Sequence, residues 1–330
     1  MTTVRDDAPV AIVGAGSIGL GWAIVFARAG LSVRLFDVDP VARDAAADQL
    51  RQRLAELAAN ELLDEPVADV AVRVRVCDSL AHAVSDADWV QECIVEDLDA
   101  KRAVFAELDT LAPPDAILAS STSMIPCSRW ADDLPGRARC LVVHPGNPPY
   151  LLPVAELVPA PFTSEATVER AAAAQREIGM TPVVVHGEPE GFVFNRLQGA
   201  LLREAYCLVR DGVVSAAEVD QVVSSGLGRR WAVIGPFATA QLNTRGGIRR
   251  HARVMGPAYA RMGAERGQDD PWTPELIDRV AADLAVRLPD DGWAQQTLRR
   301  DAALVDLERA RRADPELFAS FDAPRPSAGP

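Results

Sequence analysis

The segment from Val10 to Gly19 reads VAIVGAGSIG and constrains the fold more than any other part of the chain. An apolar run precedes the glycines, and an amphipathic stretch over 20–29 follows them. This pattern predicts a buried strand, a tight turn, and a helix whose first N–H groups and positive dipole end face an anion. Gly14 permits the turn, Gly16 lets the backbone approach a pyrophosphate, and Gly19 lets the helix pack closely on the strand.

The residue that closes the next predicted strand selects the cofactor. That strand spans 31–36 and is followed by Asp37. A carboxylate at this position accepts hydrogen bonds from a ribose diol and repels a 2′-phosphate. Residues 38–40 supply no cation that would reverse this preference. The sequence therefore predicts NAD rather than NADP, bound by Asp37, by the three glycines, and by Ser17 and Ile18 at the start of the helix.

Length and charge bound the class of protein. The chain has 330 residues, enough for two domains, and 48% of them are hydrophobic. No apolar run approaches the ~18 residues of a membrane span, and the short acidic start is unlike a signal peptide. The formal net charge is −13, without the basic bulk of a nucleic-acid-binding protein. The cysteines are scattered without a CxxC pair, so we expect a reduced, cytoplasmic protein with no metal site.

Strand-like and helix-like segments alternate through the first part of the chain, which predicts a parallel sheet. One helix is expected to begin at Pro40, with Asp39 as its cap, and to run to about Leu63. Beyond residue 191 helical periodicity dominates. The predicted fold class is α/β, with a Rossmann-type dinucleotide-binding domain over 1–190, an all-helical C-terminal domain over 191–320 and a disordered tail over 321–330.

One histidine stands where a catalytic base is expected. His144 follows the apolar run 141–143, and ligands of open parallel sheets bind beyond the carboxyl ends of the strands. A structural histidine at a strand end is an equally good interpretation from position alone. Glu156 favours the catalytic one, because it lies in the apolar stretch 153–158, where a charge is costly unless it is paired. A carboxylate on one imidazole nitrogen fixes the tautomer and leaves the other nitrogen free to act as a base.

Hydroxyl and amide groups accompany this pair. The run Ser120–Ser123 follows the apolar segment 117–119, although one of these residues could instead cap the helix predicted after it. Asn195 lies on a helix that begins where the second domain meets the first, among large apolar side chains. Its amide needs a partner, which an oxygen of the substrate or a neighbouring hydroxyl would supply.

These features occur together in a known family. The glycine motif is followed by QECIVEDLDAK at 91–101, by the serine run, by HPGNP at 144–148, by ELV at 156–158, by GFVFNRL at 191–197 and by GPF at 235–237. In this order and spacing, the chain resembles the 3-hydroxyacyl-CoA dehydrogenases over roughly residues 8–265.

The resemblance implies a role for each candidate residue. In the family, the histidine matching His144 is the base and the glutamate matching Glu156 is its partner. The positions matching Ser123 and Asn195 contact the substrate hydroxyl and its surroundings, and we add Ser121 as a further predicted substrate contact. Family members dimerise through their helical domain, so a homodimer is expected.

Lys101 is the single lysine among 34 basic residues. Chance in an arginine-rich chain would explain it, and so would a place where a compact ammonium fits and a wide guanidinium does not. The resemblance favours the second explanation, because the residues matching Glu96 and Lys101 touch the nicotinamide half of NAD.

Within the family, NPPY at 147–150 and NRLQ at 195–198 are most similar to the lambda-crystallin branch, which oxidises L-gulonate. Two features favour a small free acid over a thioester. The helix after the second strand turns acidic over 60–65, which suits the phosphates of CoA poorly. Arg230 lies in a run that is uncharged in the thioester enzymes and is predicted to bind a substrate carboxylate, although a solvated surface charge is an equally good interpretation.

Three hypotheses of function follow. The first is an NAD-dependent dehydrogenase that oxidises the 3-hydroxyl of a small hydroxy acid such as L-gulonate. The second is a short-chain 3-hydroxyacyl-CoA or L-carnitine-type dehydrogenase. The third is a non-enzymatic structural protein that binds NAD, and the intact set of His144, Glu156 and Asn195 argues against it. Apart from a second copy, the expected partner is a small molecule, with no nucleic acid and no membrane.

Overall fold

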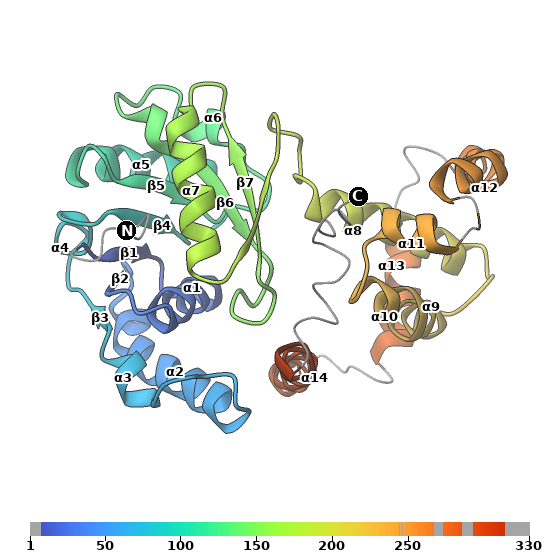
Figure 1. Cartoon of the computed structure of the whole chain (residues 1–330), viewed down its shortest axis with the longest axis horizontal. Helices are drawn as coiled ribbons and strands as arrows, with labels where there is room; N and C mark the ends of the chain where they lie inside the picture. Colours follow the sequence, from blue (N-terminus) through green and yellow to red (C-terminus); the bar gives the residue numbers. More distant parts are fainter. Residues whose placement is uncertain (1–7, 244, 246, 267–272, 286–292, 314–330) are drawn as a thin grey trace, which may run out of the picture. The chain divides into compact units, whose positions relative to one another are not determined.

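A computed structural model describes residues 8–243, 245, 247–266, 273–285 and 293–313. The chain divides into two compact units, a first unit of residues 1–196 and a second unit of residues 197–330. The first unit contains the whole of the sheet, and the second is helical (Figure 1). The predicted fold class is therefore confirmed. The units divide at Arg196 and Leu197, a few residues beyond the predicted domain boundary, and the predicted tail over 321–330 lies outside the described residues.

The first unit is built on an eight-stranded sheet with the order β3-β2-β1-β4-β5-β6-β7-β8. Every neighbouring pair is parallel except β6 and β7, which are antiparallel. The carboxyl end of β6 therefore lies beside the beginning of β7. The strands are β1 (Val10–Val13), β2 (Val33–Phe36), β3 (Val74–Val76), β4 (Trp89–Glu92), β5 (Ile117–Ser120), β6 (Cys140–Pro145), β7 (Val154–Pro159) and β8 (Thr181–Val184).

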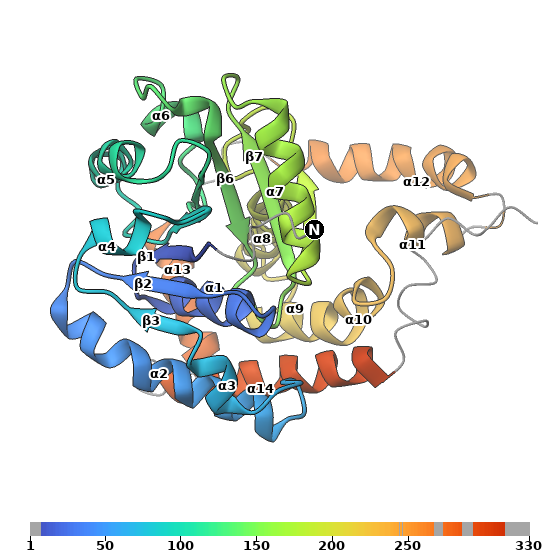
Figure 2. The same cartoon turned by 60° about the vertical axis from the view of Figure 1, so that its left-hand side comes forward.

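Helices cover both faces of this sheet (Figure 2). Helices α4, α5 and α6 pack on one face, and α1 and α7 pack on the other. The helices of the first unit are α1 (Ser17–Arg28), α2 (Pro40–Ala59), α3 (Val67–Ala71), α4 (Leu80–Val84), α5 (Leu98–Leu111), α6 (Cys127–Trp130), the 3₁₀ turn η1 (Arg137–Arg139), α7 (Glu165–Glu177) and the start of α8 (Phe194–Arg210).

Successive side chains of β1 point to opposite faces of the sheet, so this strand contributes to the core on both faces. Ala11 and Val13 are buried against the helices of one face, together with Phe105 of α5. On the other face the rings of Phe26 and Trp89 lie 6.1 Å apart and are fully buried. A strand that is apolar on both faces is typical of a central parallel strand, as the sequence predicts for this segment.

Helix α2 starts as predicted and ends earlier than predicted. The Asp39 side chain caps it by accepting the N–H of Val41, and Pro40 is its first residue. It ends at Ala59 and not near Leu63, because Glu61 takes a left-handed φ of +59° that no helix can continue. The acidic segment over 60–65 is therefore a turn and not part of the helix.

The described residues of the second unit form helices of 4 to 21 residues. Ser215 and Glu218 form the capping box at the start of α9, and Val209, Ala216 and Leu276 form a small buried cluster. Its helices, after the remainder of α8, are α9 (Ala216–Val222), the π-helical η2 (Val223–Leu227), α10 (Gly228–Trp231), α11 (Pro236–Asn243), α12 (Gly247–Ala264), α13 (Pro274–Ala285) and α14 (Trp293–Ala313). Over the residues that the structure describes, no helix combines the length and the apolar character needed to cross a membrane.

Candidate active site

The glycine turn lies between β1 and α1, and its three glycines meet different surroundings. Gly14 has a φ of +110°, and a Cβ on it would lie 2.5 Å from the carbonyl oxygen of Cys93. A Cβ on Gly19 would lie 1.9 Å from the carbonyl oxygen of Gly14, so the helix packs directly on the turn. A Cβ on Gly16 would meet no atom within 4 Å. The turn therefore offers open space beside its backbone, which is what a bound pyrophosphate requires.

Asp37 lies at the end of β2, beside this turn. One of its carboxylate oxygens accepts the N–H of Ala15 at 2.7 Å, and the other accepts the N–H of Asp39 at 2.9 Å. These bonds orient the carboxylate, and each oxygen keeps a lone pair for a ribose hydroxyl. The described residues thus fit the adenosine half of NAD.

Two arginines of α2, which the sequence analysis did not single out, donate hydrogen bonds to backbone carbonyl groups beside the glycine turn. Nη1 of Arg43 donates to the carbonyl oxygen of Asp37 at 2.6 Å, and Nη1 of Arg53 donates to the carbonyl oxygen of Ser17 at 3.1 Å. Ser17 is exposed and Ile18 is half-buried, so both can contact a ligand above the helix start. Long side chains that cross from one helix to another leave no local sequence signal, which is why these contacts were missed.

His144 and Glu156 stand opposite each other on the antiparallel pair of β6 and β7. Directly opposed residues place their side chains on the same face of the sheet, close enough to touch. Nδ1 of His144 lies 2.8 Å from Oε2 of Glu156, and the two residues are only 7% and 3% exposed. Within the described part of the chain, no hydrogen bond reaches Nε2 of His144. This nitrogen is therefore available to a ligand.

The second oxygen of Glu156 is held by the backbone at the start of α8. Oε1 accepts the N–H of Val193 at 2.7 Å and that of Phe194 at 2.9 Å. The chain turns toward it through Gly191 and Phe192, whose φ angles are +73° and +52°. A left-handed conformation costs a residue such as Phe192 about 1–2 kcal/mol. Burial of its ring and the two hydrogen bonds that follow it offset this cost.

These contacts keep Glu156 ionised. Burial raises the pKa of Glu156, but the hydrogen bonds from His144, Phe194 and Val193 outweigh burial and hold the pKa below its ordinary value. The rings of Phe192 and Phe194 lie 5.7 Å and 6.2 Å from the imidazole ring of His144. The imidazole is thus oriented by a carboxylate and enclosed by aromatic rings, which is an arrangement suited to a general base.

Three of the four hydroxyl groups at the end of β5 have partners. The Ser120 hydroxyl donates to Glu92, and the Thr122 hydroxyl donates to Glu96. The Ser121 hydroxyl also makes hydrogen bonds to other side chains. By contrast, the Ser123 hydroxyl makes no hydrogen bond to any described residue, and its side chain is half-buried. Ser123 therefore presents the hydroxyl that is free to meet a substrate.

The Ser121 hydroxyl sits in a buried polar cluster. It accepts Nε1–H of Trp22 at 3.1 Å and Nε2–H of Gln91 at 2.7 Å, and it lies 3.2 Å from Sγ of Cys93. Because two N–H groups occupy its lone pairs, its own proton points to the sulfur. Burial raises the pKa of Cys93, so this thiol stays protonated at neutral pH. The predicted contact between Ser121 and the substrate would have to break one of these bonds, and it stays a prediction.

Asn195 lies beside Ser123. Its Nδ2 donates to the carbonyl oxygen of Ser123 at 3.1 Å, and its neighbour Phe194 contacts both Glu156 and His144. The structure therefore brings together the four predicted catalytic residues, His144, Glu156, Ser123 and Asn195, at the carboxyl edge of the sheet. Their roles in the reaction remain proposals.

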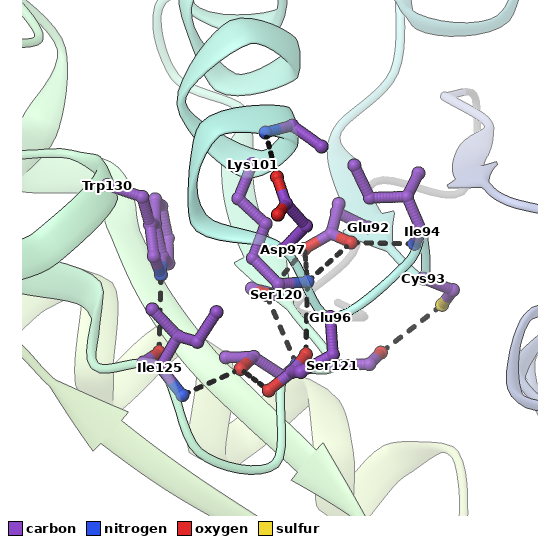
Figure 3. Close-up of polar contacts among 12 residues, drawn as sticks. Glu92, Cys93, Ile94, Glu96, Asp97, Lys101, Ser120, Ser121, Ile125 and Trp130 are labelled. Atoms are coloured by element: carbon purple, nitrogen blue, oxygen red, sulfur yellow. Dashed lines mark hydrogen bonds and ion pairs between the residues drawn. The ribbon is translucent and has the colours of Figure 1, made fainter.

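Lys101, in the first turn of α5, lies between the carboxylates of Glu92 and Glu96 (Figure 3). Its Nζ is 3.0 Å and 3.1 Å from the two carboxylate oxygens of Glu92 and 3.4 Å from Oε2 of Glu96. Lys101 is 1% exposed and Glu92 is fully buried. The predicted contact of Glu96 and Lys101 with NAD stays a prediction. Sequence reasoning missed Glu92, although a glutamate inside an apolar strand is the signal that singled out Glu156.

Arg230 lies on α10 in the second unit and is exposed there. Its predicted role as the anchor of a substrate carboxylate stays a prediction. Across the described ranges of the chain, no group of three or more His, Cys, Asp or Glu side chains is arranged to hold a metal ion. The candidate site therefore consists of a dinucleotide turn, an imidazole–carboxylate pair, and one free hydroxyl with a neighbouring amide.

Fold and site together define a dinucleotide-dependent dehydrogenase. Residues 9–188 match the NAD binding domain of 3-hydroxyacyl-CoA dehydrogenase, and residues 191–288 match its C-terminal domain. The chain belongs to this family, and the predicted resemblance is confirmed. It is an NAD-dependent oxidoreductase that acts on a CH–OH group.

Three similar proteins illustrate the range of the family. The lambda-crystallin homolog of Bos taurus is 38% identical over 332 residues, which cover 96% of this chain and all of that protein. The L-carnitine dehydrogenase of a Pseudomonas species is 37% identical and covers 95% of this chain and 92% of its own length. A solved NAD⁺-dependent dismutase, the 5-dehydrogenase of 5-formyl-3-hydroxy-2-methylpyridine 4-carboxylic acid, has a TM-score of 0.78 and 32% identity, covering 92% of this chain and 97% of that one.

Proposed function

We propose that this chain is an NAD-dependent dehydrogenase that oxidises the 3-hydroxyl of a small hydroxy acid of the L-gulonate type. The observation that carries the proposal is the buried pair of His144 and Glu156, joined at 2.8 Å with Nε2 of the imidazole left free. The motifs at 147–150 and 195–198, which resemble the lambda-crystallin branch, favour a free acid, and the chain is similar to lambda-crystallin homologs over most of its length. We further propose a cytoplasmic homodimer formed through the helical unit.

The imidazole removes the hydroxyl proton. His144 receives it at Nε2, while Nδ1 keeps its own proton in the hydrogen bond to Glu156, so an imidazolium forms beside a carboxylate. Glu156 stabilises that imidazolium and prevents the ring from turning, because its other oxygen is fixed by two backbone N–H groups. Bound NAD supplies the acceptor for the hydride that leaves C3 of the substrate.

Ser123 and Asn195 orient the reacting alcohol. The free hydroxyl of Ser123 can donate to the substrate oxygen as it becomes a carbonyl oxygen, without first breaking a bond within the described protein. The Asn195 amide is held to the Ser123 carbonyl group, so the two side chains keep one spacing. A fixed pair of polar groups around one hydroxyl favours a single orientation of the alcohol.

The kind of acid is the part of the proposal that needs a substrate screen. L-carnitine dehydrogenases and a 3-hydroxybutyryl-CoA dehydrogenase are among the similar proteins, so both are competing substrate classes. We propose that Arg230 binds the carboxylate of a free acid, because a guanidinium matches a carboxylate with two parallel hydrogen bonds.

The test is NADH formation with four substrates, measured by absorbance: L-gulonate, L-carnitine, 3-hydroxybutyrate and 3-hydroxybutyryl-CoA. We expect the highest kcat/KM with L-gulonate. A preference for the CoA thioester would overturn the assignment to a free acid and leave the proposed base untouched.

The base is tested separately with His144→Ala on the best substrate. We expect kcat to fall about 10²–10⁴-fold, the usual contribution of a positioned general base. His186→Ala is the matched control, because His186 is exposed and lies in a loop outside the site, and it should retain full activity. A His144→Ala enzyme with kcat within tenfold of the unmodified protein would remove His144 as the base.

A further inference from the structure

A guanidinium lies beside the residue whose carboxylate is expected to bind the ribose. Arg43 is the fourth residue of α2, and its Nη1 donates to the carbonyl oxygens of Asp37 and Val38 at 2.6 Å and 3.2 Å. Its guanidinium carbon also lies 5.8 Å from the centre of the Phe36 ring. A cation is attracted to an aromatic face, so contacts with three consecutive residues hold this head group at the carboxyl end of β2.

These contacts leave the charge of Arg43 without a partner carboxylate. Its hydrogen bonds to described residues all come from Nη1 and go to backbone carbonyl groups, and no carboxylate in the described ranges forms an ion pair with it. The two carboxylate oxygens of Asp37 are bound instead by the N–H groups of Ala15 and Asp39. The half-buried side chain of Arg43 therefore keeps its positive charge, and the N–H groups of Nε and Nη2, for a further acceptor.

The opposite charges of Asp37 and Arg43 act differently on the two nicotinamide dinucleotides. NAD carries a hydroxyl on C2′ of its adenosine ribose, which a carboxylate accepts, whereas NADP carries a phosphate there, which a carboxylate repels. A guanidinium binds a phosphate through parallel, charge-assisted hydrogen bonds. The end of β2 thus presents one group that rejects a 2′-phosphate and, next to it, one whose chemistry suits that phosphate.

The order of residues along the chain conceals this cation. Residues 38–40 contain no basic side chain, and Arg43 reaches the strand end only because α2 begins at Pro40 and directs its fourth residue back toward Asp37. Arg51, further along the same helix, pairs with Asp48 at 2.6 Å and is 60% exposed. What distinguishes Arg43 is therefore its place beside Asp37 and not its charge alone.

We propose that Arg43 is a second determinant of the choice of dinucleotide, a ligand for a 2′-phosphate that Asp37 keeps out. In the unmodified protein, Arg43 limits how strongly NADP is rejected. Once the charge of Asp37 is removed, Arg43 binds NADP through its 2′-phosphate. The proposal concerns the dinucleotide alone, so it does not depend on which hydroxy acid is oxidised or on which residue is the base.

The experiment measures the ratio of the dissociation constant of NADP⁺ to that of NAD⁺, each obtained from displacement of NADH followed by its fluorescence. No hydroxy acid is present, so a wrong substrate assignment cannot alter the result. Asp37→Ser removes the carboxylate, and the serine hydroxyl can still accept the N–H of Asp39. We expect this variant to lower the ratio at least about tenfold, because the repulsion of the 2′-phosphate is lost.

Arg43→Gln is then compared in both backgrounds. Together with Asp37→Ser, it should raise the ratio about tenfold or more, the usual effect of losing a hydrogen bond to a charged group. In the unmodified background we expect a rise of about threefold, because the carboxylate of Asp37 already keeps the phosphate away from the guanidinium. Arg43→Lys keeps the charge without the planar fork, so it should raise the ratio less than Arg43→Gln does.

Arg51→Gln is the matched control, since it removes the same charge from the same helix, and it should leave the ratio unchanged. If Arg43 only supports the backbone at the end of β2, Arg43→Gln will weaken both dinucleotides equally, and an unchanged ratio would overturn the proposal. An effect of Arg51→Gln as large as that of Arg43→Gln would overturn it too, because net charge would then be the cause. Should Asp37→Ser fail to fold, the unmodified background decides, and a change of less than about twofold in Arg43→Gln would count against the proposal.

Discussion

Replacing Glu156 by Gln tests the proposed base at the level of a single proton. In the structure, Oε1 of Glu156 accepts two backbone N–H groups, from Val193 and Phe194, and Oε2 faces Nδ1 of His144. An amide placed there must turn its oxygen to the two N–H groups, because the opposite orientation would set donors against donors. The NH₂ group then faces His144, and Nδ1 can satisfy it only as an acceptor.

This reversal moves the ring proton to the wrong nitrogen. With Nδ1 as an acceptor, the neutral imidazole carries its proton on Nε2, the atom that must receive the proton of the alcohol. Replacing the aspartate of a Ser-His-Asp triad by asparagine lowers kcat by about 10⁴-fold, because it favours the same unproductive tautomer of the histidine. We therefore expect a loss of about 10²–10⁴ in kcat, equal to about 2.7–5.4 kcal/mol of activation free energy.

The fold should change far less than the rate. All three hydrogen bonds of the side chain survive with neutral partners, so the free energy of unfolding should fall by no more than about 2 kcal/mol. The assay is single-turnover NADH formation together with thermal unfolding. The ¹⁵N spectrum of the labelled imidazoles reports the tautomer directly, and only four histidines contribute to it. A variant with kcat within tenfold of the unmodified enzyme, or with its Nδ1 proton retained, would refute the argument.

Three further predictions concern the glycine turn, the titration of Glu156 and the proposed role of Arg230. Gly16→Ala should keep the melting temperature and weaken NADH binding at least about tenfold, because the open space beside Gly16 is where the pyrophosphate is expected. Gly19→Ala should destabilise the fold by about 3 kcal/mol or more, because its Cβ would lie 1.9 Å from a carbonyl oxygen. Calorimetry and NADH titration separate the two effects. Because the hydrogen bonds to Glu156 hold its pKa in the folded protein below its ordinary value, its contribution to stability is present above that ordinary value and is lost as the pH falls through the lowered pKa. The melting-temperature difference between the unmodified protein and Glu156→Gln should therefore shrink as the pH falls below the ordinary pKa of a glutamate. Arg230→Met should raise KM for a free acid about tenfold or more and leave NADH affinity unchanged, and an unchanged KM would exclude Arg230 as the carboxylate anchor.

Much of the site could be predicted because its signals are local. The spacing of the glycines and the acid at Asp37 place the dinucleotide turn within one strand–helix–strand unit. Glu156 stands out as a charge in an apolar strand, and the antiparallel return of β7 beside β6 puts it against His144. In each case a short segment carries both the residue and its structural context.

The parts that escaped prediction depend on partners from distant segments or on uncommon backbone conformations. Four hydroxyl residues in a row look alike in sequence, and the structure separates Ser123 from Ser121 only through Trp22 of α1 and Gln91 of β4. The two backbone hydrogen bonds to Oε1 of Glu156 require Phe192 in a left-handed conformation, which residue preferences disfavour. The early end of α2 likewise depends on a left-handed glutamate rather than on a glycine.

Glu156 and Glu96 make similar hydrogen bonds at this edge of the sheet, but they differ in the nitrogen side chain that each contacts. Glu156 and Glu96 each give one oxygen to backbone N–H groups and the other to a nitrogen side chain. At Glu156 that side chain is an imidazole, which can exchange donor for acceptor by changing tautomer, so an amide can be accommodated at the expense of the base. At Glu96 it is the ammonium of Lys101, which has donors only, so an amide must disturb either the ammonium or the Ser123 loop. The same substitution should therefore abolish proton transfer at Glu156 while the fold is kept, whereas at Glu96 it should disturb the contact with Lys101 or with the loop that carries Ser123 while the base is kept.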